Sequence, residues 1–153
     1  MDGIEVQLMQ EVQELKRRVA NMCRMYTVHS VDYAKALARV TAGGEWVSHW
    51  LRWTTSRASN DVTWWSPEVG EQVMVFSPNG ETEKGVIMQA VYQAAHPAPA
   101  ASPDISYIRY KDGTELLYDR ADHVLLADVK GDVVAKVAGN VTATVVGNIT
   151  ATA

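Results

Sequence analysis

The chain has 153 residues, enough for one ordinary domain with extensions, and 47% of them are hydrophobic while 21% are charged. This balance excludes a disordered tail. The formal net charge of −4 argues against DNA or RNA as the main partner, because binding to phosphates requires a basic face.

The sequence carries no targeting signal that we recognise. Residues 1–5 lack an apolar signal core, and no stretch reaches the roughly 18 apolar residues that a membrane span requires. We therefore expect a protein that is made and assembled in the cytoplasm, with no signal peptide and no transmembrane segment.

Residues 1–23 are predicted to form an N-terminal helix. Its apolar side chains recur at intervals of 4, 3, 4, 3 and 4 residues, which is a heptad seam: Leu8, Val12, Leu15, Val19, Met22 and Tyr26. A seam of this length makes only a marginal helix by itself. It packs either on its own domain or on a neighbouring subunit or partner, and the sequence leaves both readings open.

Residues 24–120 read as a domain of short strands. Strands are expected at 26–31, 36–41, 46–53, 73–76, 85–92, 105–110 and 115–118, separated by turns such as Asn79-Gly80 and Asp112-Gly113. The segment 73–76 is apolar on both faces, so we expect a central strand there. Many short strands indicate a small barrel or sandwich. The Ala- and Pro-rich residues 94–103 are expected to be an exposed loop, and residues 121–130 a connector.

Residues 131–153 repeat with a period of eight. Each repeat opens with a glycine and an Asp or Asn, which tolerate turn conformations: Gly131, Asp132, Gly139, Asn140, Gly147 and Asn148. The third, fifth and seventh positions share one face of a strand and are predicted to point inward: Val133, Ala135, Val137, Val141, Ala143, Val145, Ile149 and Ala151.

One copy of this repeat cannot bury its apolar side chains or pair its backbone groups by itself. Its apolar stripe has no second layer to cover it, and every strand would be an unpaired edge. Three copies wound about a common axis bury the stripes and pair the edges. Fibrils and a single-chain solenoid are the competing structures, but eight residues are too few for a solenoid turn around a core. We therefore predict a homotrimer with an intertwined β-helix.

No catalytic or metal-binding motif stands out. The four histidines are scattered, and there is no nucleophile elbow, P-loop or dinucleotide fingerprint. The five tryptophans within residues 46–65 could stack sugars or bases, but such clusters more often form a core or an interface. We expect no enzyme. A binding module for oligosaccharide or nucleic acid is the alternative.

The segment from Trp64 to Val73 resembles the phage baseplate assembly protein V family, the central spikes of contractile phage tails and R-type pyocins. The residues that carry the resemblance are Trp64, Trp65, Pro67, Val69, Gly70, Glu71 and Val73. The likeness continues through residues 76–81, 85–87, Tyr92, 95–98, 102–104, 110–114 and 118–119, and it covers most of the chain from about residue 15 onward.

The resemblance implies a mainly β architecture with an N-terminal helix, an OB-fold barrel and a C-terminal intertwined trimeric β-helix. It implies a trimeric spike at the baseplate of a phage or phage-tail-like particle. That spike would pierce the bacterial outer membrane when the sheath contracts. Its OB domain would dock to baseplate hub proteins and would not bind nucleic acid, which agrees with the acidic charge.

One departure concerns metal. Spikes of the family often hold an iron ion at the tip through an H-x-H motif, and this sequence has none. We therefore assign no metal or other cofactor to this chain. Because the sequence reaches Ala153 inside a repeat, we expect the tip to lie outside it or to be built differently.

Overall fold

The computed structural model describes residues 3–152, with only the backbone described at Gln89. Met1 and Asp2, at the start of the predicted helical region, and Ala153, at the end of the predicted repeat, lie outside the described residues. The chain forms two compact units, Met1–Ala98 and Pro99–Ala153. Each is mainly β, apart from one long helix in the first.

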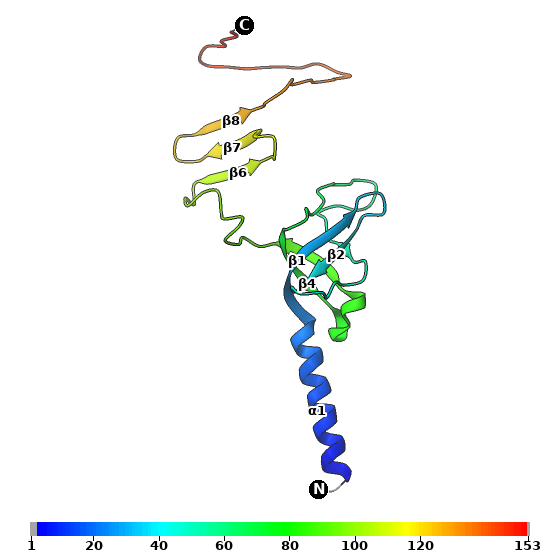
Figure 1. Cartoon of the computed structure of the whole chain (residues 1–153). Coiled ribbons are helices and arrows are strands. Elements are labelled where there is room, and N and C mark those ends of the chain that lie inside the picture. The colour runs from blue at the N-terminus through cyan, green and yellow to red at the C-terminus, as the bar shows by residue number, and fades with distance from the viewer. Residues whose placement is uncertain (1–2, 153) are drawn as a thin grey trace. The chain divides into compact units, whose positions relative to one another are not determined.

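Helix α1 (Gly3–Met22) leads directly into strand β1 (Cys23–Asp32), as Figure 1 shows. None of the described residues of the helix is buried. The prediction that Tyr26 continues the helical seam is wrong, because Tyr26 lies on β1 and is buried in the core of the first unit. The side-chain period changes from 3.6 to 2 at Cys23, so a residue four positions after Met22 no longer shares its face.

The end of α1 is fixed to the first unit by a tight turn. The backbone N–H of Ser77 donates to the carbonyl oxygen of Met22 at 2.8 Å. The 3-10 turn η1 (Pro78–Gly80) then brings Gly80 against Arg18 so closely that a Cβ on Gly80 would lie 2.3 Å from the Arg18 carbonyl oxygen. Gly80 also has a φ of +70°, which favours glycine. The turn predicted at Asn79-Gly80 is confirmed.

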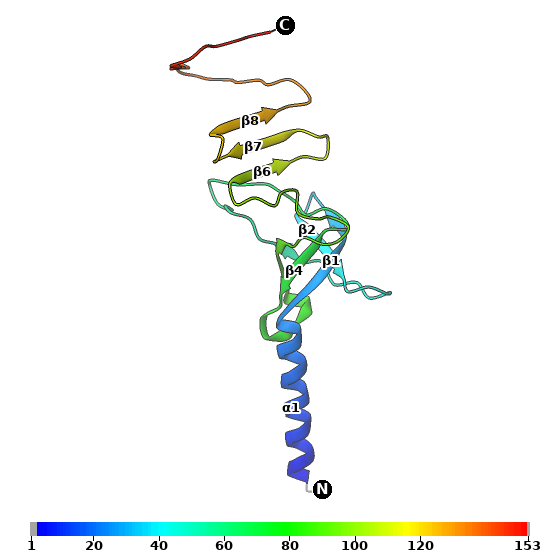
Figure 2. The same cartoon turned by 90° about the vertical axis from the view of Figure 1, so that its left-hand side faces the viewer.

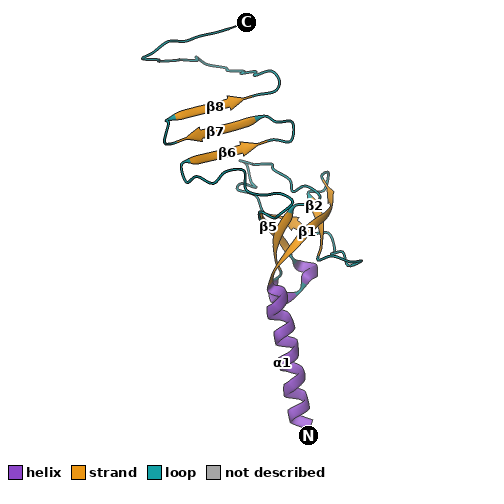
Figure 3. Cartoon of the chain, turned by 60° about the vertical axis from the view of Figure 1, so that its left-hand side comes forward, coloured by secondary structure: helices purple, strands orange, loops and turns teal. Residues whose placement is uncertain are grey.

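The first unit is a nearly closed barrel of five strands in the order β2-β1-β4-β5-β3. Figure 3 shows its orange strands beside the purple helix. Besides β1, the strands are β2 (Leu37–Thr41), β3 (Arg52–Trp53), β4 (Gln72–Phe76) and β5 (Val86–Ala90). A second 3-10 turn, η2 (Thr82–Lys84), precedes β5.

Backbone hydrogen bonds join the two edges of this sheet. Ala38 on β2 and Leu51, next to β3, exchange two of them, at 2.9 and 2.8 Å. Strand β1 pairs with β4 along one edge and with β2 along the other, and its pairing with β2 shifts register between Val28 and Ser30. Such bulges bend a strand. The sheet thus curls into the barrel that the strand pattern predicts.

The barrel interior is a small core of aliphatic residues and one tyrosine. Strand β4 lies between β1 and β5, which confirms the predicted central strand. Alternate residues of the strands point inward, as a period of two requires. The buried apolar residues are Tyr26, Val28, Ala38, Val40, Leu51, Val73, Val75 and Ile87.

The tryptophans are not the core that one reading of the sequence expected. Trp53 packs against the core from its edge, whereas Trp46, Trp50, Trp64 and Trp65 are exposed. The predicted strand 46–53 is correspondingly reduced to Arg52–Trp53. Aliphatic residues of β1, β2, β4 and β5 fill the narrow barrel instead, so the indole rings remain on its outside.

The second unit contains one antiparallel sheet in the order β6-β7-β8, which Figure 2 shows as three successive strands. They are β6 (Ile105–Arg109), β7 (Glu115–Asp119) and β8 (Val124–Asp128). The hairpin predicted at Asp112-Gly113 is confirmed, with the Thr114 N–H donating to Asp112 Oδ1 at 2.9 Å and Gly113 at a φ of +89°.

The position of this sheet in the chain does not agree with the domain boundaries expected from the sequence. The sequence predicts β6 and β7 within the barrel domain and residues 121–130 as a connector. The units instead divide at Ala98, inside the Ala- and Pro-rich segment. That segment was interpreted as a loop within one domain, but such composition is equally typical of a boundary between domains.

None of the described residues 99–152 is buried. The sheet of the second unit has no covering layer within its own unit, and no strand is assigned in the described residues 131–152. Inward and outward positions of the repeat, such as Val141 and Val146, are both exposed in one chain. The intertwined trimeric β-helix therefore stays a prediction.

Candidate functional site

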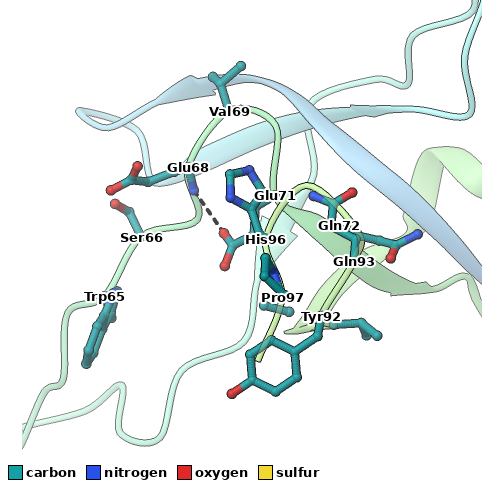
Figure 4. Close-up of a pocket in the computed structure, with 12 residues that line it drawn as sticks. Trp65, Ser66, Glu68, Val69, Glu71, Gln72, Tyr92, Gln93, His96 and Pro97 are labelled. Carbon is teal, nitrogen blue, oxygen red and sulfur yellow. Dashed lines mark hydrogen bonds between the residues drawn. The ribbon is translucent and has the colours of Figure 1, made fainter. Parts of the chain in front are cut away.

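A cleft of about 480 Å³ opens on the first unit (Figure 4). It lies where the segment before β4 meets the segment after β5, and we call it the aromatic cleft. Its lining residues are Trp65, Ser66, Glu68, Val69, Glu71, Gln72, Ala90, Val91, Tyr92, Gln93, His96 and Pro97.

Part of the Trp64–Val73 motif builds the wall of this cleft. The Gly70 N–H donates to the Val28 carbonyl oxygen at 2.9 Å, and the Val28 N–H donates to the Glu71 carbonyl oxygen at 2.8 Å. Gly70 has a φ of +92°, which a side chain would strain. Pro67 and Val73 are buried. These four motif residues therefore hold the segment against β1 and the core.

The carboxylate of Glu71 fixes the turn itself. Its Oε2 accepts a hydrogen bond from the Glu68 N–H at 3.0 Å, drawn as the dashed line in Figure 4, and the Glu71 N–H donates to the Glu68 carbonyl oxygen at 3.2 Å. The paired glutamates that the sequence places around Gly70 thus share a turn. Nothing in this geometry requires them to act as an acid–base pair.

The remaining motif residues face outward. Trp64, Trp65 and Val69 are each more than 60% exposed, and so is Tyr92 on the other side of the cleft. Figure 4 shows the rings of Trp65 and Tyr92 pointing away from the barrel strands. Trp64 touches Trp53 edge-on, with ring centroids 5.6 Å apart. Exposed aromatic residues of this kind are typical of binding surfaces.

Reasoning from single motifs missed the far wall of the cleft. Gln93 donates from Nε2 to the Gly70 carbonyl oxygen at 2.8 Å, and Gln93 and His96 are joined by two backbone hydrogen bonds of 3.2 and 3.0 Å. His96-Pro97 lies in the Ala- and Pro-rich segment that was interpreted as a passive loop. The family resemblance includes residues 95–98 and was the available signal.

Two further sets of predicted residues lie elsewhere. The seam residues Leu8, Val12, Leu15, Val19 and Met22 lie along one exposed face of α1. The predicted axis and turn positions of the repeat lie in the second unit, where those that the structure describes are exposed. One chain therefore leaves both sets without a covering surface.

The described residues do not fit an iron site. Residues 3–152 contain no group of three or more His, Cys, Asp or Glu side chains placed to hold a metal ion. No helix within these residues combines the length and apolarity needed to cross a membrane. The geometry of one chain does not test an ion shared between chains, so the absence of a cofactor stays a prediction, as does the absence of enzymatic activity.

Comparison with known proteins bears on the barrel most directly. The family model of the type VI secretion system/phage-baseplate injector OB domain matches residues 25–92. Over 108 residues, 71% of this chain, the sequence is 36% identical to the spike protein of Escherichia phage P2. The chain belongs to the phage baseplate assembly protein V family. It spans about half of the P2 spike protein, 51% of whose length is aligned.

The family match covers the barrel and all of the aromatic cleft except Gln93, His96 and Pro97. It runs from β1 through β5 to Tyr92 and includes the whole Trp64–Val73 motif. Helix α1 and the second unit lie outside it. The barrel is thus an injector OB domain, and this family is one of structural baseplate proteins rather than enzymes.

Proposed function

We propose that this protein is the trimeric central spike of a contractile-tail baseplate and acts mechanically. In this proposal the OB domain docks to the baseplate hub, and the spike is driven through the bacterial outer membrane when the sheath contracts. The observation that carries the proposal is the joining of an injector OB domain to an octad β-repeat within one chain.

The exposure of the second unit supports a trimer. Val133, Val141 and Ile149, all at predicted inward positions, are each at least 75% exposed in one chain. Three copies around an axis would bury these side chains and pair the strand edges. The small Ala135, Ala143 and Ala151 would occupy the crowded centre. Burial contributes about 25 cal/mol per Å² of apolar surface, so a repeated stripe gains stability with each turn.

A mechanical role is consistent with such a shaft. Interchain pairing satisfies every backbone group and leaves no free edge at which the shaft could open. Transmitting force also requires no catalytic group. The chain would have transient contact with the outer membrane and lasting contact with the hub.

The exposed motif residues are the surface that we assign to the hub. Trp65 and Val69 line one side of the aromatic cleft, the exposed Trp64 precedes Trp65 in the chain, and Tyr92 lines the other side. Aromatic side chains dominate the energetics of protein interfaces. The chain's formal charge of −4 makes a protein a better partner for this surface than a nucleic acid.

Co-purification tests the docking claim. The chain and the hub protein of the same particle should elute together, and Trp65→Ala with Val69→Asp should abolish the complex. Trp50→Ala is the control, because Trp50 is also an exposed indole, at 46% against 63% for Trp65, but lies outside the cleft. Equal loss of binding in the control, or full binding by the cleft variant, would contradict docking through this surface.

Contraction in the presence of target cells tests the mechanical claim. Particles that carry the wild-type chain should admit a small periplasmic reporter substrate through the outer membrane when the sheath contracts. Particles whose shaft is disrupted by Ala143→Asp should contract without admitting it, whereas Thr142→Asp particles should behave as wild type. Unchanged entry with the Ala143→Asp shaft would count against piercing.

The cleft also supports a second candidate function, binding of an oligosaccharide. Trp65 and Tyr92 expose ring faces beside Glu68 and Gln72, and aromatic rings with polar neighbours suit sugars. Tryptophan fluorescence measured with bacterial oligosaccharide and with single-stranded DNA separates a spike that docks to the hub from a binding module. Saturable quenching that Trp65→Ala removes would favour the binding module.

A further inference from the structure

The uncovered apolar face of α1 lies outside every site described above. Its residues Leu8, Val12, Leu15, Val19 and Met22 are 55, 45, 59, 67 and 37% exposed. The helix end is held against the barrel through Ser77 and Gly80, so the rest of the helix cannot fold back to cover this face without breaking that junction. A helix with such a stripe packs on another surface.

The spacing fixes a heptad register for this face. Val12 and Val19 take the a positions, and Leu8, Leu15 and Met22 take the d positions. The outer b, c and f positions then carry mostly polar side chains, such as those of Gln10, Gln13, Glu14 and Arg17. From Leu8 to Met22 the apolar stripe and the polar face are therefore separated as a coiled coil requires.

The same register makes the face complementary to itself. Glu11 falls at g and Lys16 at e, and in a parallel coiled coil the g residue of one helix faces the e residue five positions later in its neighbour. Neither Glu11 nor Lys16 forms an ion pair with another described residue. Glu14, in contrast, binds Arg17 and Arg18 within the helix, each at 2.8 Å.

We propose that α1 packs in parallel against the α1 helices of two other copies of this chain, with Glu11 of each copy facing Lys16 of the next. The interface is a three-stranded coiled coil with Val12 and Val19 inside. This proposal rests on the proposed function, because the trimeric repeat brings three chains together.

The number of helices follows from the trimeric repeat, which joins three chains. Valine at a and leucine at d favour two strands in an isolated coil. Here Ile4 at g and Met9 at e add apolar surface beside Leu8, which suits a third helix, while Glu5 at a means that the apolar seam itself begins at Leu8. Chains already joined at the repeat also present their helices to one another at an effective concentration on the order of millimolar. A short seam that is marginal alone can form under that condition.

Disulfide trapping in the full chain tests the interface. Cys23 is first changed to Ser, because it is exposed and would react. Val12→Cys then places one thiol per chain at an a position inside the coil, and Gln13→Cys places it at the adjacent outer b position as a matched control. Mild oxidation at low protein concentration should link Val12→Cys chains into pairs and leave Gln13→Cys chains unlinked.

The yield reports the number of helices. In a three-stranded coil with one thiol per chain, two chains pair and the third cannot, so linkage should stop at about two thirds of the chains. Complete linkage would indicate a two-stranded coil and would overturn the proposal. So would equal linkage in the Gln13→Cys control.

Light scattering on the same samples separates this inference from the proposed function. Three subunits with no Val12→Cys linkage would overturn the coiled coil alone and would indicate that α1 binds another protein. A single-subunit mass would remove the trimeric spike and the coiled coil with it. Three subunits with about two-thirds linkage is the expected result.

Discussion

The barrel and the second unit meet the requirement for burial in opposite ways. The barrel joins its own edges through Ala38 and Leu51 and buries residues such as Val28 and Ile87 within one chain. The described part of the second unit buries none of its residues, although its strands and repeat are rich in Val, Leu and Ile. Similar β-forming residues thus produce a self-sufficient domain in one case and an exposed surface in the other.

This contrast teaches that closure, rather than composition, decides whether a β segment can stand alone. A five-stranded sheet curls until its edges meet and its inner face becomes a core. A three-stranded sheet and an eight-residue repeat are too narrow to do this. If the proposed function is right, two further chains provide the covering surface and the edge pairing that the barrel provides for itself.

A charge at the repeat axis should have the largest effect. Ala143→Asp would bring three carboxylates together near a dry axis, where each unpaired charge costs several kcal/mol. We expect the trimer to dissociate while the barrel stays folded. Thr142→Asp, one position along and facing outward, is the control and should change stability by less than about 0.5 kcal/mol. Light scattering and thermal unfolding measure both variants, and equal effects would show that the inward face is misassigned.

Truncating one isoleucine in each unit compares the two modes of burial directly. Ile87 is 1% exposed in the barrel, so Ile87→Ala should reduce the free energy of unfolding by about 2–5 kcal/mol at any protein concentration. Ile149 is 76% exposed in one chain, so Ile149→Ala should weaken only the trimer, and its effect should depend on concentration. Denaturation at two protein concentrations measures both. A concentration-independent loss at Ile149 would contradict burial between chains.

Removing the exposed ion pairs of Glu14 should have the smallest effect on stability. Hydrogen bonds from Arg17 and then Arg18 lower the pKa of Glu14 from 4.5 to about 2. Because the folded pKa is the lower one, the stabilisation is present above about pH 4.5 and is lost as the pH falls toward 2. Glu14→Gln should slightly reduce the helical circular dichroism signal at neutral pH, and the difference should vanish near pH 2. A difference that persists there would assign Glu14 another role.

Much of the barrel could be predicted from the sequence because its signals are local. Val73 to Phe76 is apolar on both faces and became the central strand of the barrel. Outside the barrel, Asp112-Gly113 formed the predicted hairpin of the second unit for the same reason. Tyr26 was misassigned because an apolar strand residue can lie, by chance, four positions after the last residue of a helical seam. Only the structure shows that the helix ends at Met22.

The division of the chain and the walls of the cleft needed long-range information. Pairing alone shows that β6 and β7 join β8 rather than the barrel. Gln93 lies 23 residues after Gly70 and contacts it only because β4 and β5 are neighbours. The sequence identifies the motif residues Trp65 and Val69. It does not show that they are exposed, because tryptophan and valine side chains are often buried.

The mass of the purified chain in solution tests the central claim most directly. Light scattering coupled to size exclusion should give three times the 16.8 kDa chain mass, in one species, over a wide range of protein concentration. A monodisperse species of one chain mass would contradict the trimeric spike. It would mean that the exposed residues of the second unit are covered by something other than two further copies of this chain.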